Sequence, residues 1–153
     1  QAVPDAVGDL RLATENYQRQ LISACLERHQ HNWASAAREL GLSDWSMDRS
    51  GLAQLQQLLD RGLVSADNLL LARGLGVVLG DALSCEMDDM DWHMVSDDWG
   101  TDPVVRYRET SIQVGARDMV LKRLEDGQSV DLLHLLDGVI SHLQPMIDSG
   151  DYQ

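Results

Sequence analysis

One short segment of the chain concentrates carboxylic acids without a single lysine or arginine among them. In order, its seven acids are Glu86, Asp88, Asp89, Asp91, Asp97, Asp98 and Asp102. We call these seven residues the acidic rim. Such a surface repels phosphate backbones and anionic lipid, and it attracts a basic protein. The segment lacks the D-x-D-x-D-G spacing with a following glutamate that a calcium loop needs. We therefore predict a partner-binding surface for a basic protein; the alternative is a solvated loop that only aids solubility.

The histidines do not form a metal-ligating pattern. His29 and His31 are two apart, so they point to different sides of a helix. His134 and His142 are eight apart and can share one helix face, but ligand pairs are normally three or four apart, with a third ligand nearby. We therefore expect neither a metal nor a cofactor.

The sequence also carries no recognisable reaction centre. It has no nucleophile elbow and no phosphate-binding loop, and the glycines of residues 74–80 lie within an apolar helical stretch rather than after a strand. An enzyme of unknown reaction is a less favoured alternative, with catalytic residues unknown. The residues to inspect first are Asp81, His93 and Glu125.

Net charge and hydropathy narrow the class of protein. The 153 residues include 44% hydrophobic residues and carry a net charge of −13, and 17 of the 25 acids follow residue 64. The longest apolar stretch, Leu69–Leu83, is interrupted by Arg73 and Asp81, which makes it unsuitable as a membrane span. We expect a soluble cytoplasmic protein that binds neither nucleic acid nor membrane; the oligomeric state stays open.

Cys25 and Cys85 lie in apolar helical stretches and are predicted to be buried thiols rather than a disulfide.

The N-terminal third is predicted to be helical. Residues 1–9 show no periodicity and are expected to form a flexible arm. A first helix runs from Leu12 to about Gln30 with Thr14 as a possible cap, and a second covers 33–40. A linker of residues 41–51 follows.

The remainder alternates between helices and a small sheet. We predict helices over 49–61, from a Ser65 cap to Leu83, over 116–124, and from Val130 to Pro145. Each glycine in a helix costs roughly 1 kcal/mol against alanine, so three of them, at 74, 76 and 80, indicate close backbone packing. Residues 91–96, 104–108 and 111–114 are predicted to be the strands of an antiparallel meander, with DDWG at 97–100 as a turn.

These elements predict an α+β fold in which helices pack on a small three-stranded antiparallel sheet, with an N-terminal helical extension. We expect a single domain over residues 1–153: the arm at 1–9, the extension at 10–46 and an α+β body at 47–148.

Two stretches resemble known families. The motifs LAQLQQLLDRG at 52–62, LGVVLGDAL at 75–83, the Trp92 strand and KRLEDGQSVDLLHLL at 122–136 resemble a family of small bacterial proteins that constitutes a domain of unknown function. That resemblance covers about 50–140 and implies an α+β domain without an established activity.

The second resemblance concerns ACLERHQHNWASAARELGLSDWS at 24–46, which is similar to the Fis-type helix-turn-helix of bacterial transcription regulators. The matching residues are Asn32, Ala36, Ala37, Leu40, Gly41 and Leu42. A recognition helix presents Arg or Lys to the groove, but the following stretch is richer in Asp. We favour a non-enzymatic protein-binding module of immunity or regulatory type, with a helix-turn-helix transcription-related protein as the alternative.

Overall fold

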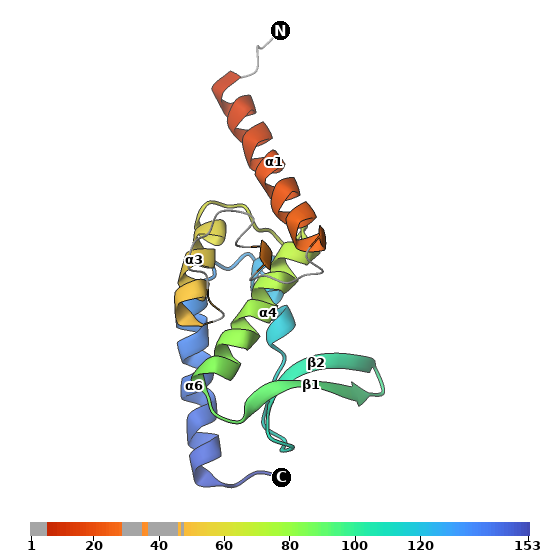
Figure 1. Cartoon of the computed structure of the whole chain (residues 1–153), viewed down its shortest axis with the longest axis vertical. Helices are drawn as coiled ribbons and strands as arrows, with labels where there is room; N and C mark the ends of the chain where they lie inside the picture. The colour runs from red at the N-terminus through yellow and green to blue at the C-terminus, as the bar shows by residue number, and fades with distance from the viewer. Residues whose placement is uncertain (1–5, 29–34, 37–45, 47) are drawn as a thin grey trace.

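The computed structural model describes residues 6–28, 35–36, 46 and 48–153. Its elements are α1 (Ala6–Arg28), α3 (Arg49–Asp60), α4 (Leu69–Glu86), β1 (Met90–Asp97), β2 (Gly100–Tyr107), β3 (Gln113–Val114), the 3₁₀ turn η1 (Ala116–Asp118), α5 (Met119–Glu125) and α6 (Leu132–Ser149). The strands form one antiparallel sheet in the order β1-β2-β3. Figure 1 shows the β1–β2 hairpin projecting from one side of the helices and α1 rising from the other end. The predicted α+β class, three-stranded sheet and N-terminal helical extension are confirmed. The division into arm, extension and body stays a prediction.

Helix α4 is the centre of the hydrophobic core. Its buried positions include leucines in four successive turns, at 71, 75, 79 and 83. A Cβ atom added to Gly76 would collide with the Arg117 carbonyl oxygen and come within 2.6 Å of its carbon, and one added to Gly80 would collide with Cζ2 of the Trp92 ring. The close backbone approach predicted from the glycine spacing is therefore confirmed at Gly76, whereas the neighbour of Gly80 is a side chain.

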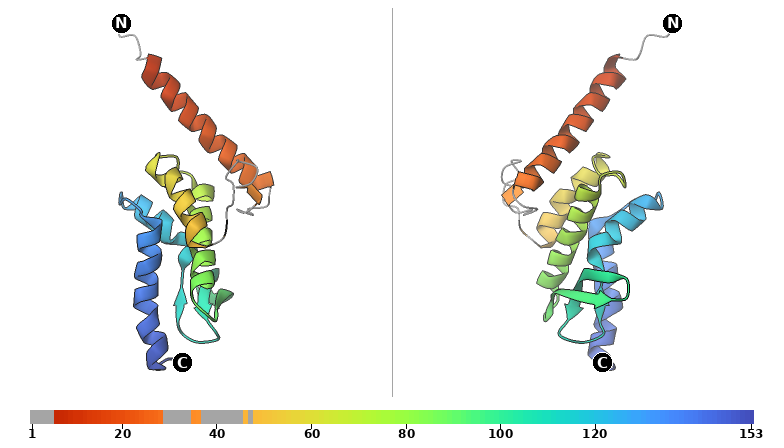
Figure 2. Two further views of the ribbon diagram at one scale, coloured as in Figure 1. Left: turned by 60° about the vertical axis from the view of Figure 1, so that its left-hand side comes forward. Right: turned by 90° about the vertical axis from the view of Figure 1, so that its right-hand side faces the viewer.

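Helix α6 lies beside α3 and α4 and closes the other side of the core. Figure 2 shows the three helices together, with the sheet at their lower end. Asp131 caps α6 by accepting a hydrogen bond from the His134 N–H at 3.1 Å. An exposed bidentate ion pair joins Arg49 of α3 to Asp137 of α6, at 2.7 and 3.0 Å.

The structure corrects several predicted boundaries in the N-terminal half. Helix α1 begins at Ala6 instead of Leu12, so residues 6–9 are helical and Thr14 lies inside the helix. The first turns of α1 extend away from the body in Figure 1, which explains why the residues there show no apolar periodicity. The predicted helix at 33–40, the linker and most of the Fis-like pattern lie largely outside the described residues. Of that helix, Ser35 and Ala36 are described, and both are helical.

The strand boundaries differ as well: β2 begins at Gly100 instead of 104, because it pairs with β1 up to the turn, and β3 consists of Gln113–Val114 alone instead of 111–114. Helices α4 and α6 also depart from the prediction. Asn68, and not Ser65, caps α4, because its side-chain oxygen accepts the Leu71 N–H at 3.2 Å. Helix α6 passes through Pro145 and ends at Ser149. Proline removes one helical hydrogen bond, but the acceptor four residues earlier belongs to the exposed Ser141, where water can replace it.

The cysteine prediction is half right. Cys25 is buried and is not joined to Cys85 by a disulfide, but Cys85 is exposed in the last turn of α4. Within the described part of the chain, every helix is too short or too polar to cross a membrane.

Candidate partner-binding site

The β1–β2 hairpin carries most of the acidic rim. Its two strands pair along their full length, from Met90 opposite Tyr107 to Asp97 opposite Gly100. The two-residue turn is held by the Asp97 carboxylate, which accepts the Trp99 N–H at 2.8 Å. One residue pair further down, the hydroxyls of Ser96 and Thr101 are 2.7 Å apart. The predicted turn at 97–100 is confirmed, and Trp99 at its tip is 94% exposed.

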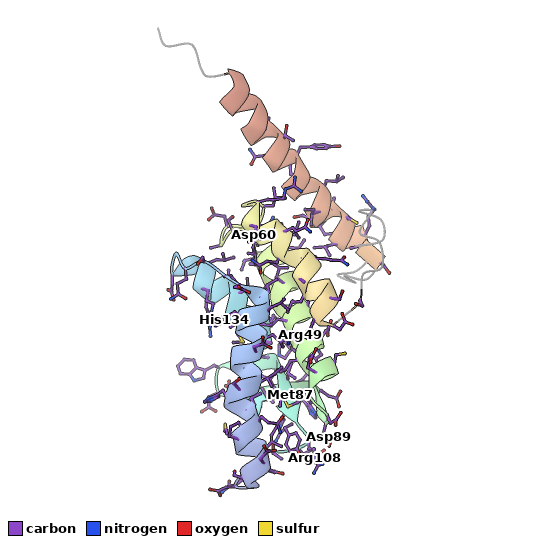
Figure 3. The ribbon with its side chains drawn as sticks, turned by 90° about the vertical axis from the view of Figure 1, so that its left-hand side faces the viewer. Arg49, Asp60, Met87, Asp89, Arg108 and His134 are labelled. Carbon is purple, nitrogen blue, oxygen red and sulfur yellow. The ribbon has the colours of Figure 1, made fainter. Side chains whose placement is uncertain are left out.

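The acidic rim does not converge on one point. All seven side chains are exposed, but they are distributed over the end of α4, the following loop, both strands and the turn. Two of them pair with arginines from outside the segment. Arg108 binds Asp89 at 2.8 Å where the sheet begins, and Arg117 binds Asp102 at 3.2 Å (Figure 3 labels the first pair). Sequence reasoning missed both pairs because the partners meet only through the strand register and the packing of η1 on β2.

Trp92 fixes the hairpin to α4. Its ring lies over Gly80, and its Nε1–H donates to the Asp81 carboxylate at 2.9 Å. Burial raises the pKa of Asp81 above its usual value of 3.8, although the indole hydrogen bond opposes that rise. The hairpin is therefore attached to α4 at one end of β1, where the Trp92 indole packs on Gly80 and donates a hydrogen bond to Asp81.

The outer edge of β1 is open among the residues that the structure describes. The Arg108 N–H donates to the Asp89 carbonyl at 2.9 Å, so Asp89 and Arg108 form a hydrogen-bonded pair of the antiparallel ladder. Along such a ladder, hydrogen-bonded pairs alternate with pairs whose main-chain groups point away from the partner strand. By that alternation the main-chain groups of Trp92, Met94 and Ser96 point away from β2. No hydrogen bond to these outward groups is found within residues 48–153 or the other described ranges.

Two shallow pockets flank the same strand. One of about 360 Å³ is lined by Val77, Asp81, Trp92, His93, Met94 and Pro103. The other, of about 340 Å³, is lined by Asp48, Asp81, Ser84, Cys85, Asp91 and Trp92. Three carboxylates thus line the second pocket. The pKa of Asp48 is held below its usual value, chiefly by the hydrogen bond from Ser46, so this carboxylate is ionised at neutral pH.

A larger cavity than these two lies elsewhere. About 920 Å³ lie between α6, α5 and β3, and His134, His142 and Arg123 are among the lining residues. The two histidines do share one helix face, as their spacing allows. No group of three His, Cys, Asp or Glu side chains suited to a metal occurs in the described part of the chain. Asp81 and His93 line one pocket together, whereas Glu125 ends α5 and lines neither pocket beside β1.

Comparison with known proteins gives two family matches. A model for "Domain of unknown function (DUF3806)" matches residues 51–135, which include most of α3 and all of α4, the sheet and α5. A model for "Bacterial regulatory protein, Fis family" matches residues 14–44. Both resemblances seen in the sequence are thereby confirmed. No curated protein gives a significant match.

Among solved structures, a crystal structure from Bacteroides thetaiotaomicron VPI-5482 is similar to this chain, with a TM-score of 0.61 and 18% sequence identity. The similarity covers 86% of this chain and 44% of that one. This chain therefore spans less than half the length of that protein, and at such low identity the likeness concerns the fold alone.

Proposed function

The chain belongs to the Domain of unknown function (DUF3806) family, and within that family we propose that it is a non-enzymatic protein-binding module of immunity or regulatory type. Its acidic rim would receive a basic partner. The observation that carries this proposal is Trp99, which is 94% exposed at the tip of the hairpin and follows directly on Asp97 and Asp98.

Aromatic residues are the side chains most enriched at the energetic centres of protein interfaces, because they bury a large area at a small entropic cost. A cation from the partner can also stack on an indole face while it pairs with the neighbouring carboxylates. Met94, on the same hairpin, is 66% exposed. Exposed apolar groups beside Asp97 and Asp98, which form no ion pair with another described residue, favour a partner that offers both arginine or lysine and an apolar contact.

A pull-down from the source organism tests the proposal, with Trp99→Ala and with Asp97→Asn/Asp98→Asn. The asparagine at 97 keeps an oxygen for the Trp99 N–H, so the turn is preserved. We expect both variants to lose the partner that the unmodified protein captures, since an interface anchor contributes about 2 kcal/mol or more, roughly a 30-fold change in affinity.

The matched control is Glu125→Gln/Asp126→Asn, which removes the same charge from two exposed residues at the end of α5. This form should capture the partner normally. Equal recovery by all four proteins would remove the acidic rim and Trp99 from the mechanism.

A second candidate is a helix-turn-helix transcription-related protein, which the Fis-family match over residues 14–44 favours. Against it stands the net charge of −13, because counterion release by basic side chains supplies most non-specific DNA affinity.

A further inference from the structure

We propose that the partner contributes an extended basic segment that pairs with the outer edge of β1 as a fourth strand of the sheet. This inference rests on the proposed function and names the form of the partner. Main-chain hydrogen bonds would supply affinity, and the side chains beside the edge would supply specificity, as in other cases of strand addition.

The open edge is an unusual feature of this sheet. Proteins normally protect a long edge strand with lysine, proline, a bulge or a covering element, because unpaired main-chain groups recruit other strands. β1 is eight residues long and has neither lysine nor proline; the charges it does carry, Asp91 and Asp97, deter an acidic strand and attract a basic one. Trp92, Met94 and Ser96 present their N–H and C=O groups outward without a partner among the described residues.

The opposite side of the sheet is protected in the usual ways. β3 consists of Gln113 and Val114 alone, so it offers little to pair with. Past the end of β3, the edge is formed by β2 itself. The next β2 residue whose main chain faces this edge is Pro103, two residues before Val105, and proline has no N–H to donate. Because, in the described part of the chain, only the β1 edge offers a row of outward N–H and C=O groups, we assign the added strand to β1.

The charges beside β1 select the incoming strand. Asp91 and Asp97 lie on one face of the strand, and Trp92 and Met94 lie on the other. At the helix end of the edge, Asp48, Asp81 and Asp91 line the pocket of about 340 Å³. An extended segment with alternating basic and apolar side chains complements both faces, and one lysine or arginine can enter the acidic pocket.

A second copy of this chain fits poorly at the same edge. In the antiparallel register that pairs Met94 with its symmetry mate, Asp91 of one copy faces Asp97 of the other. Like charges directly opposite each other destabilise a strand pair. The occupant that the edge favours is therefore a basic segment of another protein.

The test uses a fluorescein-labelled peptide of eight residues, Lys and Val in alternation, and two N-methylated forms of it. These two forms are isomers of each other: one carries methyl groups on the four Lys nitrogens of the main chain, the other on the four Val nitrogens. In an extended strand, alternate N–H groups point to opposite edges. If the peptide adds to β1, one isomer loses its ladder bonds and the other keeps them. We expect saturable binding of the parent peptide by fluorescence anisotropy, and at least a tenfold difference in affinity between the isomers.

Two protein variants make the reciprocal measurement. Met94→Pro deletes an outward N–H without removing a bond to β2, whereas Met94→Ala removes the side chain and keeps the N–H. Circular dichroism first establishes that both fold. We expect Met94→Pro to weaken parent-peptide binding at least tenfold and Met94→Ala to weaken it much less.

Equal binding of the two isomers, equal loss in the two variants, or no binding of the parent peptide would overturn strand addition. So would a self-associated dimer that Met94→Pro dissociates, as measured by sedimentation. These outcomes leave the proposed function standing if Trp99→Ala and the Asp97/Asp98 variant still lose the captured partner. Failure of the proposed function is seen separately, as equal recovery in that pull-down.

Discussion

Replacing Gly76 by alanine tests whether α4 is held by direct contact between backbones. The added Cβ would come within 2.6 Å of the Arg117 carbonyl carbon and 2.7 Å of the Ala116 carbonyl oxygen. Carbon atoms in contact prefer about 3.5–4.0 Å, so η1 must move away from α4 by roughly 1 Å. That movement also strains the bond between Arg73 of α4 and Asp118 of η1, which is 3.0 Å long.

Overpacking of this kind costs about 1–3 kcal/mol, and alanine recovers about 0.5–1 kcal/mol of helix propensity over glycine. Because the obstacle is main chain, which cannot rotate aside, we expect Gly76→Ala to lower the free energy of unfolding by about 1–2 kcal/mol. Equilibrium urea denaturation followed by circular dichroism measures the change, as a lower midpoint at an unchanged slope.

Gly138 of α6 provides the matched control. It is also a helical glycine, but a Cβ there would meet no atom within 4 Å. Gly138→Ala should therefore stabilise the protein by about 0.5–1 kcal/mol. A Gly76→Ala variant as stable as the Gly138→Ala variant would refute the backbone-contact reasoning.

Three further outcomes follow from the charges. Burial raises the pKa of Asp81, so its ionised form opposes folding. Asp81→Asn should be more stable than the unmodified protein at pH 7, and thermal melts should show this gain shrinking as pH falls through the raised pKa and gone below pH 3.8. The hydrogen bond from Arg49 lowers the pKa of Asp137, so Asp137→Asn should slightly lower the melting temperature at pH 7, with no difference once pH falls through the lowered pKa. Duplex DNA at low salt should show no saturable binding in an anisotropy titration, because the chain is strongly acidic; micromolar binding would contradict this.

The sequence predicted best where local signals agreed with packing. Helix α3, the hairpin turn and the close contacts of Gly76 and Gly80 were all predictable, because periodicity, turn residues and glycine spacing are local. The extent of α1 was not predictable, since its first turns extend from the body and need no apolar face. Pro145 misled the prediction of the end of α6, because water can satisfy the carbonyl that it leaves unpaired.

For the candidate site, the sequence predicted which residues are acidic but not how they are arranged. The acids of the rim are exposed as expected, but their distribution over the hairpin and their pairing with Arg108 and Arg117 depend on the strand register. The open edge of β1 could not be read from the sequence either, because strand order is a property of the whole sheet.

The two buried glycines of α4 face different kinds of neighbour, and this difference bears on how the family can diverge. Gly80 meets the ring of Trp92, a side chain that a second mutation can shorten, so positions 80 and 92 can change together over time. Gly76 meets main chain, which every amino acid possesses, so no substitution at 116 or 117 can compensate for a larger residue there. Among homologues, glycine at position 76 should thus persist after the pairing of 80 and 92 has been replaced.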